Sequence, residues 1–206
     1  MTAGAGTYSA LVCCAAATST AAPPLTLGGT GLPRRALSLK YRGAGGQQSG
    51  MGGAHWQSTI PFDTRRIGAA AICCSDGRYN EQFDEFLHGH LGLPRYDRLV
   101  VPGGPGVLAG HVESMRDQES LEEQIAFLVR SHELECVVLI AHESCGYYGK
   151  KLSIPSSRVR EAQRADLVKA AERLRTISVR LSVAAYLAGV HEGRVSMTPV
   201  PLDTPA

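Results

Sequence analysis

The chain has 206 residues, of which 44% are hydrophobic and 6% aromatic, so it is long enough to bury the core of one ordinary domain. Every apolar run is interrupted before the ~18 residues that a membrane-spanning helix requires, so we expect no membrane partner. All 19 acidic residues but only 17 of the 21 basic ones lie after residue 60, and this balance favours a small-molecule partner over nucleic acid.

Residues 1–58 are rich in Ala, Gly, Thr, Ser and Pro and show no sustained period of 2 or 3.6. Without a patterned apolar face, this segment is expected to be a flexible, disordered N-terminal tail. Its lack of acids is also typical of organelle transit peptides, and its first residues weakly resemble a signal peptide. A third explanation is that translation begins at Met51 and that the residues before it have no structural role.

From residue 67 onwards, compact apolar runs alternate with amphipathic stretches, a pattern typical of strands and helices in a mostly parallel sheet. The predicted strands are Ile67 to Cys73, Asp97 to Val101, Cys136 to Ala141 and a closing strand from Arg194 to Val200. The fold class that we predict for residues 59–206 is therefore α/β, with a mainly parallel β-sheet flanked by helices.

Two helices are predicted between these strands. Ser120 and Glu123 form a capping box ahead of apolar residues at helical spacing, which predicts a crossover helix between the second and third strands. A second amphipathic pattern predicts a long helix from about Arg160 to Leu187.

The six cysteines occur as Cys13-Cys14, Cys73-Cys74, Cys136 and Cys145. This is less dense than a secreted disulfide scaffold, so we expect a reducing, cytoplasmic location, with an organelle as the alternative if residues 1–58 are a transit peptide. Cys136 begins an apolar strand and is expected in the core. Cys73 is expected to point to the opposite side of its strand from Cys74.

Chemistry-bearing residues directly follow two of the predicted strands. Cys74, Asp76 and Arg78 follow the first strand, and His142 and Cys145 follow the third. Ligands of open α/β sheets bind at this carboxyl edge, so the two groups face each other if the strands are neighbours. Two thiolates and one imidazole suit zinc and leave a fourth position open, as in catalytic zinc sites. The sequence therefore predicts a zinc-binding domain.

Asp76 and Arg78 are spaced to form a carboxylate–guanidinium pair. Held by Arg78, Asp76 could orient a zinc-bound water, whose pKa zinc can bring to about 7. Released from Arg78, Asp76 could instead become a fourth metal ligand and close the site. The sequence leaves both arrangements open.

The Gly-rich segment from Gly103 to Gly106 lacks the Gly-Lys-Ser/Thr of a phosphate-binding loop. We expect a tight turn whose backbone approaches the site. Tyr147 and Tyr148 could line a pocket or could equally pack on a helix start.

The motif C-x-D-x-R, followed by H-x-x-C after another strand, resembles the β-class carbonic anhydrases over residues 67–200. The resemblance implies a zinc lyase of the carbonate dehydratase type, which hydrates carbon dioxide reversibly to bicarbonate and a proton by zinc-bound hydroxide. It implies Cys74, His142 and Cys145 as ligands, Asp76 and Arg78 as the catalytic dyad, and a homodimer or higher homo-oligomer.

One segment departs from that family. Where its members commonly have Arg-Asn-Ala-Gly-Asn, this chain has Val-Pro-Gly-Gly-Pro-Gly at residues 101–106, so side-chain donors are missing and a divergent member is indicated. Two alternatives follow: a zinc hydrolase acting on carbonyl sulfide or carbon disulfide, or a non-catalytic module that binds zinc or bicarbonate.

Overall fold

The computed structural model describes residues 57–202. The predictions about a tail or targeting segment therefore fall almost entirely outside the described residues. The chain divides into two compact units, with residues 57–65 in one and residues 66–202 in the other. The fold described below is that of residues 66–202.

The core of the fold is a single five-stranded sheet in the order β2-β1-β3-β4-β5. The three pairings among β2, β1, β3 and β4 are parallel, and only β5 runs antiparallel to its neighbour. The strands are β1 (Ala69–Cys74), β2 (Asp97–Val101), β3 (Cys136–His142), β4 (Ser182–His191) and β5 (Arg194–Pro199). The predicted mainly parallel α/β fold is confirmed.

The strands β1 and β3 occupy the middle of the sheet, and every residue in both is buried. Helices cover both faces of this region, so both strands consist of continuous apolar runs rather than alternating ones. Their direct pairing, with Ala69 opposite Cys136, confirms that the strands carrying the two motifs are neighbours. Both strands therefore end at the same edge of the sheet.

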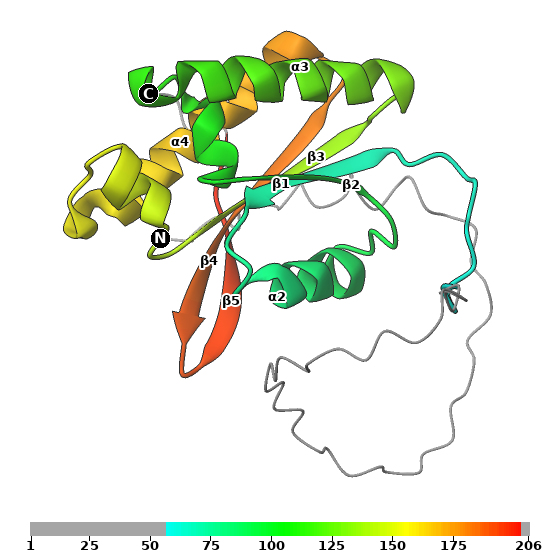
Figure 1. Cartoon of the computed structure of the whole chain (residues 1–206), viewed down its shortest axis with the longest axis horizontal. Helices are drawn as coiled ribbons and strands as arrows, with labels where there is room; N and C mark the ends of the chain where they lie inside the picture. Colours follow the sequence, from blue (N-terminus) through cyan, green and yellow to red (C-terminus); the bar gives the residue numbers. More distant parts are fainter. Residues whose placement is uncertain (1–56, 203–206) are drawn as a thin grey trace, which may run out of the picture. The chain divides into compact units, whose positions relative to one another are not determined.

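Helices lie on both sides of the sheet (Figure 1). On one face, α2 (Asn80–Glu85) and the following turn η2 (Phe86–His90) bury Phe83 and Leu87. On the other face, α3 (Met115–Ser131) and α4 (Ser156–Ile177) bury a second apolar layer. That layer includes Leu121, Ile125, Leu167 and Leu174.

Two helix predictions need correction. The helix between β2 and β3 exists, but α3 begins at Met115, so Ser120 lies inside the helix and the predicted capping box does not start it. The helix predicted from Arg160 to Leu187 ends at Ile177, and Ser182–His191 forms β4 instead. Pairing on both sides with β3 and β5 outweighs the local helical pattern there, because tertiary context routinely overrides propensity.

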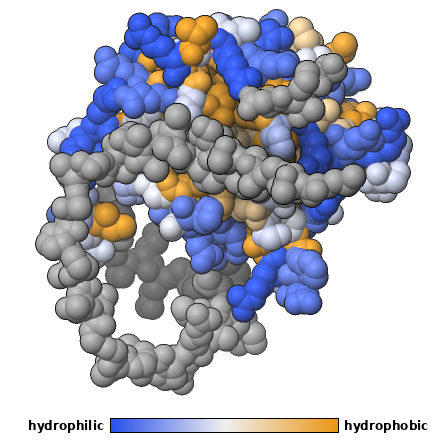
Figure 2. Space-filling view, turned by 180° about the vertical axis from the view of Figure 1, so that it is seen from behind, coloured by the Kyte–Doolittle hydropathy of each residue, from blue (hydrophilic) through white to orange (hydrophobic). Residues whose placement is uncertain are grey.

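The surface of the described residues is mixed in character. Figure 2 shows hydrophobic residues scattered among hydrophilic ones on the face that it presents. Val112 and Val179 are among the most exposed large apolar side chains, at 83% and 91%. Within residues 57–202, no helix has both the length and the apolar character needed to cross a membrane.

Candidate metal centre

Three predicted ligands converge at the carboxyl edge of the sheet. Cys74 is the last residue of β1 and His142 the last of β3. Between His142 and Cys145, Ser144 has a left-handed backbone conformation with a φ of 56°. After this turn the Sγ atom of Cys145 lies 3.7 Å from that of Cys74. The possible ligand atoms of the three residues all lie within 4.8 Å of one another. All three residues are buried.

The hydrogen bonds of His142 fit metal binding. Its Nδ1 lies 2.8 Å from the carbonyl oxygen of Glu143, and because a carbonyl can only accept, Nδ1 carries the hydrogen. Nε2 is then an acceptor, yet it is buried without a hydrogen-bond partner among the described residues. An unpaired buried acceptor beside two thiols is the arrangement that a zinc ion satisfies.

The two thiols differ in their affinity for the proton. A hydrogen bond from Cys145 is the main cause that lowers the pKa of Cys74 to about 4, and the His142 side chain and the backbone N–H groups of Gly103 and Asp76 lower it further. The same contact raises the pKa of Cys145. Of the two thiols, Cys74 is therefore the one that gives up its proton more readily.

The predicted ion pair between Asp76 and Arg78 is present at the rim. Asp76 Oδ1 accepts from Arg78 Nε at 2.9 Å, and Oδ2 accepts from a terminal guanidinium nitrogen at 2.5 Å. This pairing lowers the pKa of Asp76 to about 2. In this arrangement Arg78 holds the carboxylate, and Asp76 is not part of the converging ligand group.

The loop after β2 packs its backbone closely against Cys74, Tyr147 and Tyr148. A Cβ at Gly104 would lie 2.7 Å from the backbone nitrogen of Cys74, and a Cβ at Gly103 would lie 2.5 Å from the Tyr147 ring. A Cβ at Gly106 would meet the Tyr148 hydroxyl at 2.3 Å. The predicted close approach of this turn is therefore confirmed, and the two tyrosines pack against it.

Some residues around the site were not identified from the sequence. The ring of Tyr79 lies over His142, with centroids 4.4 Å apart, and its hydroxyl donates to the Glu143 carbonyl at 3.4 Å. Gln163 of α4 donates to the carbonyl oxygen of His142 at 2.7 Å. These contacts join residues far apart in sequence, so spacing alone carries no signal for them.

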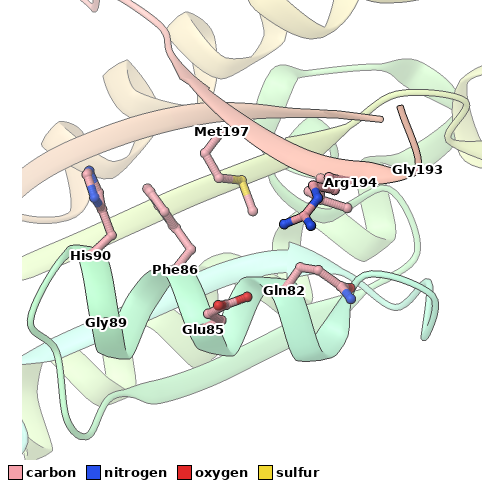
Figure 3. A pocket seen from close by; sticks show the side chains of 9 residues that line it. Gln82, Glu85, Phe86, Gly89, His90, Gly193, Arg194 and Met197 are labelled. Carbon is pink, nitrogen blue, oxygen red and sulfur yellow. The ribbon is translucent and has the colours of Figure 1, made fainter. Parts of the chain in front are cut away.

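A separate cleft of about 750 Å³ lies between the α2–η2 segment and β5. Figure 3 shows Phe86 and His90 on the helical side, with Met197 and Arg194 on the strand side. None of the three converging ligands lines this cleft, so we do not place the metal chemistry there.

Comparison with known proteins relates the chain to carbonic anhydrases. The model of a family described as "Putative carbonic anhydrase" matches residues 64–195. No curated protein matches the chain.

Solved carbonic anhydrases match the structure at low sequence identity. The enzyme from Glaciozyma antarctica is 13% identical, with 64% of this chain and 83% of that chain covered and a TM-score of 0.43. A β-carbonic anhydrase isoform from Trichomonas vaginalis is 12% identical, with 68% and 87% covered and a TM-score of 0.44. Matches at these TM-scores are weak, and the family match carries the relationship.

Proposed function

Because this chain belongs to the family described as putative carbonic anhydrases, we propose that it hydrates carbon dioxide reversibly at a zinc ion held by Cys74, His142 and Cys145. The single observation that carries the proposal is that His142 Nε2, buried and without a hydrogen-bond partner among residues 57–202, shares a group no wider than 4.8 Å with two cysteine sulfur atoms. When bound, zinc supplies the nucleophile by lowering the pKa of a coordinated water to about 7. The protein would then be a zinc lyase of the carbonate dehydratase type.

Asp76 has a defined part in this proposal. With a pKa of about 2, its carboxylate stays ionised at neutral pH and is too weak a base to remove a proton in the reaction. It acts instead as a hydrogen-bond acceptor that orients the attacking water. Arg78 binds both carboxylate oxygens and so fixes the direction of that acceptor. If the Asp76 carboxylate released Arg78 and bound the metal instead, Asp76 would become a fourth ligand and close the site.

A stopped-flow carbon dioxide hydration assay tests this function with zinc-loaded protein between about pH 7 and 9. We expect Asp76→Asn to lower kcat/KM about 10- to 100-fold while zinc content stays unchanged. Glu81→Gln, which alters an exposed carboxylate of α2, is the matched control and should keep wild-type rates. Zinc-loaded wild-type protein that shows no hydration in this range would reject the proposal.

A second candidate function is favoured by the loop after β2. Gly104 lies against the backbone of Cys74, and Gly103 and Gly106 lie against Tyr147 and Tyr148, so none of the three offers a polar side chain to the site. Sulfur is a weaker hydrogen-bond acceptor than oxygen, so carbonyl sulfide and carbon disulfide need side-chain donors at the site less than carbon dioxide does. Release of hydrogen sulfide from either one, without turnover of carbon dioxide, would favour a zinc hydrolase. Stoichiometric zinc without either activity would indicate a non-catalytic module.

We further propose that the chain assembles into a homodimer or a larger homo-oligomer, as the resemblance to β-class carbonic anhydrases implies. One of the structurally similar proteins, from Sordaria macrospora, is described as tetrameric. Val112 and Met115, which lie close together in the chain, are 83% and 44% exposed, so they offer apolar surface for a subunit contact. Light scattering after gel filtration would measure the mass, and a monomer at micromolar concentration would contradict the proposal.

A further inference from the structure

Glu143 lies between two of the proposed zinc ligands, His142 and Cys145, and is anchored by both its backbone and its side chain. Its backbone N–H donates to the carbonyl oxygen of Ala188 at 2.9 Å, which extends the β3–β4 pairing by one residue. Its carbonyl oxygen accepts from His142 Nδ1 at 2.8 Å. The position of this one peptide therefore sets both the orientation of the imidazole and the start of the turn to Cys145.

The side chain of Glu143 fixes the same peptide to two other elements. One carboxylate oxygen forms an ion pair with Arg160 of α4, and the other accepts the backbone N–H of Val190 in β4 at 3.3 Å. Gly189 makes room for this carboxylate, because a Cβ there would lie 3.0 Å from Oε1. A side chain that only faced solvent would not need that space.

Two residues of α4 hold consecutive parts of the ligand segment. Arg160 binds the Glu143 carboxylate, and Gln163, one helical turn later on the same face, donates to the His142 carbonyl oxygen at 2.7 Å. Gln163 is 1% exposed, so it has little freedom to move. The helix thus supports the segment that carries His142 and Cys145.

We propose that Glu143, Arg160 and Gln163 are positioning residues that hold the His142–Cys145 segment in its metal-binding geometry, an inference that rests on the proposed zinc site. Partners of this kind behind metal ligands change affinity about 10- to 100-fold when they are removed. The Arg160 side chain is 62% exposed and that of Glu143 is 29% exposed. Their pair adds little to overall stability, so its loss acts on the metal site and not on the fold.

The test measures zinc affinity by competition with a chromophoric chelator, and the visible absorption of the cobalt-substituted protein. We expect Glu143→Gln and Arg160→Gln each to weaken zinc binding about 10-fold and to change the cobalt spectrum. The double variant should be no weaker than either single variant, because both remove the same pair. Arg160→Lys should recover part of the loss, and Gln163→Leu should weaken binding at least as much.

Arg173→Gln is the matched control, because Arg173 forms an ion pair from α4 to Glu122 on α3, outside the ligand segment. It should keep wild-type zinc affinity and cobalt spectrum. Wild-type affinity in both Glu143→Gln and Arg160→Gln would overturn the inference, even if the protein hydrates carbon dioxide. Zinc binding that depends on Glu143 in a protein that does not hydrate carbon dioxide would support the inference and reject only the proposed function.

Discussion

The ion pair between Asp76 and Arg78 combines a strongly lowered pKa with an exposed position. Arg78 lowers the pKa of the Asp76 carboxyl from its ordinary value of 3.8 to about 2. The folded protein therefore binds this proton less readily than the unfolded chain does, so the pair stabilises the fold above about pH 4. That contribution is lost as the pH falls from 3.8 towards about 2.

We expect metal-free Asp76→Asn to be less stable than metal-free wild type at about pH 6, and the difference to disappear near pH 2. The Arg78 side chain is 72% exposed, so solvent screening keeps the difference small. Urea denaturation at several pH values would measure it. A difference that stays constant between those pH values would contradict the assigned ion pair.

The loop after β2 makes a second prediction, which concerns the packing of one element on another. A Cβ at Gly104 would lie 2.7 Å from Cys74 N and 2.9 Å from the carbonyl carbon of Cys73, and these backbone atoms cannot rotate away. We expect Gly104→Ala to cost about 1–3 kcal/mol or more and to weaken zinc binding. Urea denaturation and chelator competition would measure both effects.

Gly110→Ala separates crowding from backbone strain. Gly110 has a φ of 82°, which is no more favourable for alanine than the 55° of Gly104, but a Cβ there meets nothing within 4 Å. We expect this control to lose about 1–2 kcal/mol and to keep wild-type zinc affinity. Equal losses of affinity in the two variants would show that the close approach to Cys74 has no special role.

A strand or helix could be predicted from the sequence where the residues of that element alone determine its conformation. The strands β1, β2 and β3 are short, mostly apolar runs bounded by charge or glycine, and the grouping of Cys74, His142 and Cys145 follows from strand ends that meet at one edge of the sheet. The strand β4 was missed because Leu174, Ile177 and Leu181 continue a helical spacing. Only pairing with β3 and β5, which are distant in sequence or come later, makes Ser182–His191 a strand.

The surroundings of the ligands were predictable only in part. The approach of the Gly103–Gly106 turn follows from glycine chemistry, whereas the contacts of Tyr79 and Gln163 with the His142 region depend on how α2 and α4 pack on the sheet. Glu143 lies inside the H-x-x-C motif, yet its ion-pair partner Arg160 lies 17 positions later in the chain. Spacing within a motif does not indicate partners supplied by a separate helix.

For the whole molecule, zinc binding should appear as added stability, because a ligand that binds only the folded state stabilises it. At about 100 times the dissociation constant the gain is ~2.7 kcal/mol, or a rise in Tm of about 5–10 °C for a chain of this size. We expect Cys145→Ser to abolish this zinc-dependent rise. Differential scanning calorimetry with and without zinc would measure it.

Cys73→Ser is the control, since Cys73 packs in the apolar layer on the opposite face of the sheet from Cys74 and Cys145. It should lower the Tm of the metal-free protein, because a buried position receives a polar hydroxyl, while the rise on adding zinc is retained. Loss of that rise in Cys73→Ser as well would argue against Cys74 and Cys145 as the thiol ligands.

The two thiols also have a kinetic consequence, because Cys74 and Cys145 are 71 positions apart and flank a segment that includes β2, α3 and β3. A metal ion bound by both thiols would link the ends of the neighbouring central strands β1 and β3. Those strands could then separate only after the metal departs. A link that forms once the sheet is assembled slows unfolding more than it speeds folding, so amide hydrogens of β1 and β3 would exchange at a rate set by metal release.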